Sequence, residues 1–203
     1  MNNHIITISR QYGSGGRYVG KMLSEKLGIP FYDNEIITMS AKKSGYSEAL
    51  FEKAEQFTNG SLLYSLTMFG QPAGIGGLPL SEKVYIIQSD VIKHLADQGP
   101  CIIIGRCANY VLKEHTDTIN FFLYSDIEHR IKRAVNYYGL EEKNARDLIL
   151  KKDKKRAAYY NYYTGERWGE LSNYHLSLDT DSIGIENCVD LLESYIRHFH
   201  ESN

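Results

Sequence analysis

The sequence predicts a three-layer α/β fold around a central parallel sheet of about five strands. Three observations lead to this expectation. Short apolar runs alternate with longer segments of helical periodicity along the chain, which is the order of parallel β-α-β units. With 203 residues, 42% of them hydrophobic and 24% charged, the chain can bury a full core. No internal repeat or low-complexity tract interrupts it, so residues 1–203 are expected to form a single domain.

The first half begins with a strand at residues 4–9, a short apolar run that ends at a serine. A helix is expected next, because apolar residues then recur at helical spacing up to Gly28, a typical helix-ending residue: Val19, Met22, Leu23 and Leu27. The remaining elements of this half are expected in the order strand, helix, helix, with Asp33 ending the strand: 30–32, 35–43 and 47–57.

The middle of the chain is different, because residues 59–80 are rich in glycine and proline around an apolar patch. A long loop of this kind inside a compact domain is usually functional, interfacial or disordered. Here it could form a lid or the contact of a homodimer. Regular elements then resume as a helix, two strands, a strongly charged helical region, a strand and a closing helix: 81–97, 101–104, 118–123, 127–161, 175–178 and 183–200.

Charge and cysteine content exclude several classes of protein. The formal net charge is −2, so no overall field attracts nucleic acid. Neither the histidines nor the three cysteines follow a metal-ligand spacing, and an odd number of cysteines suggests free thiols in a reducing compartment. We find no signal-peptide pattern and no apolar segment near the ~20 residues needed to cross a bilayer. A cytoplasmic protein is therefore expected, with neither a membrane nor a nucleic acid as partner.

The first strand leads into a glycine-rich loop and then at once into a helix, an order suited to phosphate binding. Glycines allow backbone amides to turn inward, and the helix start adds positive potential. The residues expected to cradle the phosphates, with their flanks, are Arg10, Tyr12, Gly13, Ser14, Gly15, Gly16 and Arg17. The alternative is that the three glycines simply make a tight strand-to-helix turn.

Three alignments of this loop with phosphate-binding patterns compete. The dinucleotide pattern G-x-G-x-x-G fails because Tyr18 stands where the third glycine belongs. A literal G-x-x-x-x-G-K match ends at Lys21, but it lies within helical periodicity, and Met22 replaces the required serine or threonine. The third alignment places Gly16 where a P-loop carries its lysine and leaves Arg17 as the nearest cation. An arginine there can bind phosphate through two parallel donors.

Polar or glycine residues follow each expected strand: Ser9, Asp33, Gly105-Arg106, Tyr124-Ser125 and Asp179. Open α/β sheets bind ligands at the carboxyl ends of their strands, so these residues are expected to outline one site. Arg106 there either binds an anionic ligand or pairs with a carboxylate. Asp33 either orients a monophosphate or a sugar hydroxyl, or caps the helix that begins at residue 35.

The charged region 127–161 holds the other candidate cations. Arg130 and Arg133 lie three residues apart on one helical face, as do Asp153 and Arg156. They either close over phosphates or belong to a solvated face, where an ion pair contributes under ~1 kcal/mol. For the tyrosines that follow, packing of a lid or dimer contact is favoured over base stacking: Tyr159, Tyr160, Tyr162 and Tyr163.

These motifs together resemble the cytidylate kinase-like family of P-loop proteins. The stretch 9–17, which reads SRQYGSGGR, and the stretch 28–33, which reads GIPFYD, are very similar to the opening of that family. The Gly105-Arg106 pair, the D-x-x-R of 153–156 and the strand-loop-helix of 178–189 resemble its later elements. The resemblance spans nearly the full length of the chain.

The resemblance implies a P-loop NTPase-like kinase fold with a basic helical lid at 127–165, and ATP with Mg²⁺ as the phosphoryl donor. It places ATP phosphates at residues 13–17 and a nucleoside monophosphate near Asp33 and Arg106. Such chemistry depends on positioning and charge, so several cations must converge on the phosphates. The candidate catalytic residues are Arg17, Arg106, Arg130, Arg133, Asp153 and Arg156.

The sequence departs from cytidylate kinases at four positions. In the loop, Gly16 stands in place of the lysine and Tyr18 in place of the threonine. Met39 stands in place of an arginine that binds the monophosphate, and Ile149 in place of an arginine of the lid. The leading hypothesis is a nucleoside monophosphate kinase, cytidylate-like, that moves the ATP γ-phosphate to a nucleotide or small acceptor. The rival is a non-catalytic nucleotide- or anion-binding regulatory protein with a degenerate P-loop. A nucleic-acid-binding module is a third hypothesis, disfavoured by the net charge.

Overall fold

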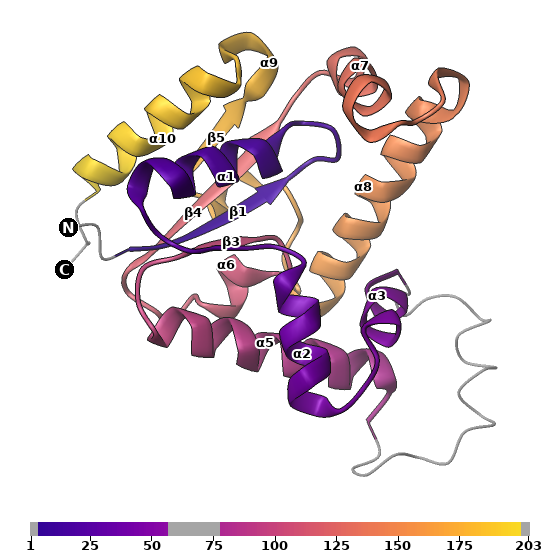
Figure 1. The fold of residues 1–203 in the computed structure, drawn as a ribbon, viewed down its shortest axis with the longest axis vertical. Helices are drawn as coiled ribbons and strands as arrows, with labels where there is room; N and C mark the ends of the chain where they lie inside the picture. Colours follow the sequence, from indigo (N-terminus) through magenta and orange to yellow (C-terminus); the bar gives the residue numbers. More distant parts are fainter. Residues whose placement is uncertain (1–3, 57–77, 200–203) are drawn as a thin grey trace.

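The computed structural model describes residues 4–56 and 78–199, in which five parallel strands form one sheet (Figure 1). The strands are β1 (Ile5–Arg10), β2 (Phe31–Tyr32), β3 (Ile102–Ile104), β4 (Thr118–Tyr124) and β5 (Leu176–Asp179). Their order across the sheet is β2-β3-β1-β4-β5, so β1 is central. The predicted α/β class with a parallel sheet of about five strands is confirmed.

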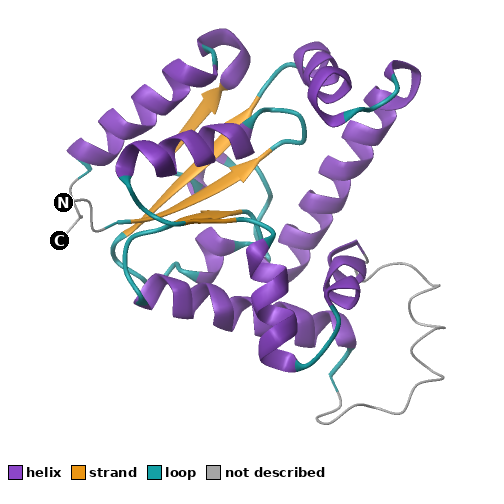
Figure 2. Ribbon diagram, viewed as in Figure 1, coloured by secondary structure: helices purple, strands orange, loops and turns teal. Residues whose placement is uncertain are grey.

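Helices cover both faces of this sheet (Figure 1). One face is covered by α1 (Gly16–Leu27) and α10 (Ile185–His198). The other face is covered by α2 (Glu35–Ser44), α5 (Leu80–Asp97) and α6 (Ala108–Val111). Beyond the ends to which the strands point stand α7 (Ile127–Tyr138) and α8 (Glu142–Thr164) (Figure 2). The shorter elements are α3 (Glu48–Gln56), a 3-10 turn (Leu171–Asn173) and α9 (Thr180–Ile183).

The alternation of side chains along the strands divides the core into two clusters. Ile6 and Ile8 of β1 pack with α1 and α10, whereas Ile5 of the same strand packs with α2, α5 and α6. β3 behaves likewise, with Ile103 on the second side of the sheet. Because both faces are covered, these strands read as continuous apolar runs, as is typical of parallel sheets.

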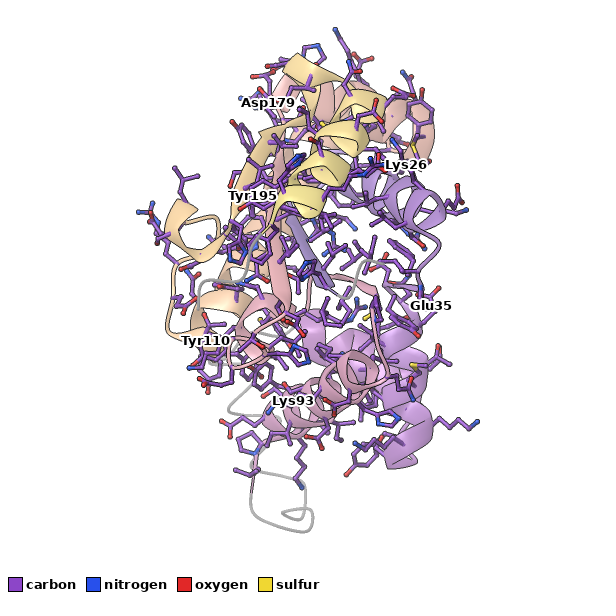
Figure 3. The ribbon with its side chains drawn as sticks, turned by 90° about the vertical axis from the view of Figure 1, so that its left-hand side faces the viewer. Lys26, Glu35, Lys93, Tyr110, Asp179 and Tyr195 are labelled. Atoms are coloured by element: carbon purple, nitrogen blue, oxygen red, sulfur yellow. The ribbon has the colours of Figure 1, made fainter. Side chains whose placement is uncertain are left out.

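At the outer surface, an ion pair joins the two helices of the first face. The ammonium of Lys26 in α1 lies 2.6 Å from carboxylate oxygens of both Asp190 and Glu193 in α10. Figure 3 labels Lys26 where α1 lies beside α10. The side chain of Lys26 is 39% exposed, so solvent screens this contact. The buried apolar cluster beneath, and not this pair, holds α10 against α1.

Two expected segments differ from the structure. The region predicted as helical over 127–161 is two helices, because Gly139 adopts a left-handed φ of +67° that ends α7 before α8 begins. The closing helix begins at Ile185, after the short α9. The predicted insertion at 59–80 lies outside the described residues except for 78–80. In the described part of the chain, no helix has the length and apolar character needed to cross a membrane.

Candidate functional site

The loop after β1, residues 11–15, folds tightly at the carboxyl end of the sheet. Gly13 has a φ of +81°, a conformation that glycine adopts without steric cost. A Cβ atom at Gly13 would lie only 2.9 Å from the backbone oxygen of Arg130, so α7 packs directly on the loop. α1 begins at Gly16, which places Lys21 well inside the helix. The literal G-x-x-x-x-G-K alignment therefore does not describe this loop.

Hydrogen bonds tie the loop to the strands on one side of β1. The amide of Gln11 donates to Leu123 O at 3.0 Å, and the amide of Ser125 donates to Gln11 Oε1 at 3.2 Å. Thr180 Oγ1, just after β5, donates to Ser14 O at 2.6 Å. The ends of β1, β4 and β5 thus meet at the loop, where the sequence predicted a convergence of strand ends.

The Thr180 contact gives a first prediction. Thr180 is 1% exposed, and its hydroxyl joins the loop to β5. Thr180→Val keeps the shape but leaves the buried Ser14 carbonyl without this donor, which is expected to lower the free energy of unfolding by about 1–2 kcal/mol. Urea unfolding measures the loss. Ser182→Ala is the control: it removes a hydroxyl whose hydrogen bond to Asp179, at 2.8 Å, is exposed to solvent, so it is expected to cost clearly less; equal losses for both would contradict this role.

Three of the predicted cations reach the loop from α7 and α8. Each donates a guanidinium hydrogen bond to a carbonyl oxygen of residues 10–13: Arg130 to Tyr12 at 3.3 Å, Arg133 to Gly13 at 2.8 Å and Arg156 to Arg10 at 2.9 Å. The α7–α8 pair therefore surrounds one edge of the loop with positive charge. The structure brings these residues to the place at which the sequence predicts phosphates.

Asp153 fastens α8 to the loop. Its Oδ1 accepts a hydrogen bond from the amide of Tyr12 at 2.7 Å, and its carboxylate pairs with Arg130. Arg156 lies further away, at 3.9 Å. Burial lowers the pKa of Arg156, and the carboxylates of Asp153 and Asp33 oppose this shift. Because Asp153 is 12% exposed and joins three elements, it is more than one half of a surface pair.

Three further arginines converge on Asp33, which is 4% exposed after β2. Their nitrogens lie close to its carboxylate oxygens: Arg17 Nε at 3.1 Å, Arg10 Nη2 at 3.4 Å and Arg106 Nη1 at 3.4 Å. Asn34 occupies the position before α2, and no side-chain hydrogen bond caps that helix. Asp33 therefore serves as the counter-charge of an arginine cluster, and Arg106 adopts the carboxylate-paired arrangement of its two expected roles.

The turn that presents Arg106 is strained. Gly105, Arg106 and Cys107 have φ values of +70°, +52° and +56° in succession, and the left-handed conformation costs about 1–2 kcal/mol for each non-glycine residue. The turn brings Arg106 Nη1 to 3.4 Å from Ile104 O and on to Asp33. Such strain is concentrated at functional sites. Cys107 is 4% exposed, as expected of a small core residue.

Two cavities lie beside the loop. The larger, of about 850 Å³, is lined by Asp33, Arg10 and Arg106 and by basic residues of α8: Lys151, Lys152, Lys155 and Arg156. The smaller, of about 380 Å³, lies among α1, α7 and the start of α10, and its lining includes Tyr18, His129, Arg133, Tyr137 and Glu186. Arg10, before the loop, lines the first cavity, and Tyr18, after it, lines the second. The two cavities are thus lined by residues on opposite flanks of the loop.

The tyrosines of α8 pack mainly against α5. Tyr159 and Tyr160 are buried, and the ring of Tyr163 stacks on that of Tyr85 with centroids 4.2 Å apart. Burial raises the pKa of Tyr85 to about 12. Tyr162, in contrast, is 46% exposed. The packing role expected for this run agrees with the structure.

Two residues of the site have no clear signal in the sequence. Thr180 follows a strand, but nothing in its surroundings indicates that its hydroxyl reaches Ser14. Lys152 Nζ lies 4.5 Å from the centre of the Tyr12 ring, yet Lys152 is one of several lysines in α8. Only the rotation of α8 about its own axis, which is set when the helix packs, places Lys152 rather than another of these lysines at the Tyr12 ring.

Comparisons with known proteins agree with this geometry. A model of the cytidylate kinase-like family matches residues 5–182. A cytidylate kinase of Sulfurisphaera tokodaii is 23% identical over 201 residues, which are 98% of each chain. The structure of an uncharacterized protein from Eubacterium ventriosum is 26% identical, with a TM-score of 0.72 over 97% of this chain and 99% of that one. Shikimate kinase from Bacteroides thetaiotaomicron, 16% identical, shares the fold, with a TM-score of 0.55 over 96% and 98%.

Proposed function

Because the chain belongs to the cytidylate kinase-like family, we propose that it moves the γ-phosphoryl group of ATP to a nucleoside monophosphate or another small phosphate-bearing acceptor. The observation that carries the proposal is a glycine loop on which arginines of α7 and α8 converge, with residues on its two flanks, Arg10 and Tyr18, lining two different cavities. Phosphoryl transfer requires two phosphate-bearing ligands to meet within a cluster of positive charge.

The larger cavity suits the acceptor. Its volume of about 850 Å³ is within the range of small-molecule sites, and an acceptor phosphate can take over the guanidinium groups of Arg10 and Arg106 that now contact Asp33. The smaller cavity, beside the start of α1, suits the nucleoside of ATP, with its phosphates extending over residues 13–17. Arg17, at the start of the same helix, lies between the two ligands in this arrangement.

In the proposed reaction, an oxygen of the acceptor phosphate forms a bond to the γ-phosphorus. The bond from that phosphorus to the bridging oxygen breaks, and ADP leaves with the electron pair. Arg130, Arg133 and Arg156 each bind a loop carbonyl through Nη1 and would donate to the oxygens of the transferred group through their remaining N–H groups. Charges already positioned before the reaction stabilise the transition state without a reorganisation cost.

The side chains at the loop do not form a Mg²⁺ site of their own. Tyr18 is 45% exposed, and its ring lies against that of Tyr137 at 6.3 Å. The hydroxyl of Ser14 donates to Gln11 O at 2.9 Å. Over residues 4–56 and 78–199, no group of three or more His, Cys, Asp or Glu side chains is placed to hold a metal ion. In the proposal, Mg²⁺ therefore enters as the ATP complex, bound by phosphate oxygens and water.

A non-catalytic nucleotide-binding protein is the second candidate, and the absence of a lysine at Gly16 favours it. Incubation of the purified protein with ATP, Mg²⁺ and a panel of nucleoside monophosphates distinguishes the two. Formation of diphosphates supports the kinase. Tight binding of ATP in calorimetry, with no turnover of any member of the panel, would instead support the binding protein.

The proposal predicts the effect of Arg106→Gln. Arg106 Nη1 contacts Asp33 in the larger cavity, so loss of its charge is expected to raise the acceptor KM about tenfold. The KM for ATP should stay near the wild-type value. Arg146→Gln is a matched control, because Arg146 pairs with Glu128 on the surface and is 57% exposed. Equal shifts of both KM values in Arg106→Gln would contradict the placement of the acceptor.

A further inference from the structure

The arginines around the glycine loop contact it from the side of α7 and α8, or lie beside Asp33. Arg17 Nε lies 3.1 Å from Asp33. The arginines of α7 and α8 donate to loop carbonyls. A P-loop lysine, in contrast, reaches the outer phosphates from the start of the helix, where this chain has Gly16. Another residue must then supply the positive charge that the P-loop lysine provides at the outer phosphates.

Lys152 is held against the loop. It lies on α8 directly before Asp153, whose carboxylate accepts the amide hydrogen bond of Tyr12 at 2.7 Å. The Lys152 ammonium lies 4.5 Å from the centre of the Tyr12 ring, and the guanidinium of Arg156 lies 5.5 Å from the same centre. The Tyr12 ring packs in turn on Tyr138, with centroids 5.6 Å apart. The Asp153 contact thus holds this turn of α8 at the loop, and the Tyr12 ring lies next to the Lys152 ammonium.

The surroundings of Lys152 are strongly positive. Desolvation by the surrounding protein lowers the pKa of Lys152, and the charges of Arg156 and Lys155 lower it further. The carboxylate of Asp153, next to it in sequence, is bound by Arg130 and Arg156 instead. Lys152, Lys155 and Arg156 all line the larger cavity. Like charges crowded at a cavity are stabilised when an anion binds among them.

We propose that Lys152 supplies from α8 the cation that the glycine loop lacks at Gly16, and that its ammonium contacts the γ-phosphoryl group during transfer. Tyr12 is a positioning residue, because its ring carries the ammonium. This inference rests on the proposed function. Lys152 contributes charge only: the bonds that form and break are those of the transfer described above, and no proton leaves the ammonium.

Steady-state kinetics of Lys152 variants test the assignment. Lys152→Ala is expected to lower kcat about 100-fold, the effect of removing one preorganised charge at a transition state, and this loss should exceed any rise in the acceptor KM that follows from its place in the lining of the larger cavity. Lys152→Arg keeps the charge and should recover most of the activity. Lys154→Ala is the matched control, because Lys154, like Lys152, is an exposed lysine of α8 but lies outside the cavity lining. Thermal unfolding of each variant shows that it is folded.

Measurements of kcat for Tyr12 variants test the role of Tyr12 separately. Tyr12→Leu removes the ring and is expected to lower kcat about tenfold, whereas Tyr12→Phe keeps the ring and is expected to lower kcat by clearly less than Tyr12→Leu does. In the Lys152→Ala background, Tyr12→Leu should cause no further loss, because the ring acts through the ammonium. Losses that multiply in the double variant would mean that Tyr12 acts only on the structure of the loop.

The outcomes separate this inference from the proposed function. If the wild-type protein forms diphosphates and Lys152→Ala does so with the same kcat, the proposed role of Lys152 is overturned, whereas the proposed kinase activity is supported. If the wild-type protein phosphorylates no acceptor, the proposed kinase activity is contradicted. Calorimetry with ATP and AMP then tests whether Lys152 contacts the outer phosphates. An ATP affinity about tenfold lower in Lys152→Ala, with AMP affinity unchanged, supports contact with the outer phosphates. Unchanged affinity for ATP overturns it.

Discussion

Replacement of Arg130 by alanine is expected to lower the free energy of unfolding by about 3–5 kcal/mol, the cost of leaving a buried carboxylate without its partner. The side chains of Arg130 and Asp153 are only 6% and 12% exposed. Arg130 also donates to Tyr12 O, and Asp153 accepts from the Tyr12 amide. Loss of the guanidinium therefore leaves a nearly buried negative charge and loosens the contact between α7, α8 and the loop.

Urea unfolding of a double-mutant cycle tests this prediction. Asp153→Asn in the Arg130→Ala background removes the unpaired charge while keeping an oxygen for the Tyr12 amide, so it should restore part of the lost stability. Arg146→Ala is the control: its pair with Glu128 is 57% and 63% exposed, and its loss should cost less than about 1 kcal/mol. A similarly small loss in Arg130→Ala would show that the Asp153 carboxylate is solvated.

Much of the fold follows from local sequence pattern. The continuous apolar runs at β1, β3 and β4 predict strands covered on both faces, and the two core clusters agree with this. Helix ends were harder to place. Gly139 interrupts the charged region with a left-handed residue, but the lysines and arginines on both sides of it favour helix equally, so periodicity alone does not separate α7 from α8.

The site was predictable where it depends on strand ends. Arg10, Asp33 and Arg106 each follow or end a strand, and parallel strands bring such residues to one edge. Contacts that depend on the docking of a helix were not predictable. Lys152 and Lys154 are equivalent in sequence, and only the rotation of α8 places Lys152 over the Tyr12 ring. The same rotation turns Asp153 toward the Tyr12 amide.

A lysine restored at position 16 is expected to lower activity about tenfold or more, although it restores the lysine of the P-loop pattern. A Cβ atom at Gly16 would lie 2.7 Å from Cβ and 3.0 Å from Cγ of Arg10. These atoms are near the backbone of β1 and cannot swing away as the end of a side chain can. Overpacking of this kind costs about 1–3 kcal/mol and displaces Arg10 from Asp33. Assays of Gly16→Lys and Gly16→Ala measure the effect.

The clash also explains why Gly16 and Arg10 occur together. In the alignment that puts Gly16 at the lysine position, Arg10 stands where the pattern has its first glycine, so the two departures are coupled sterically. Arg10→Gly in the Gly16→Lys background removes the clashing atoms and should recover activity lost in Gly16→Lys, while Arg10→Gly alone should lower activity by removing a contact to Asp33. If the two losses simply add, the side chain of Arg10 does not determine the glycine, and the steric explanation fails.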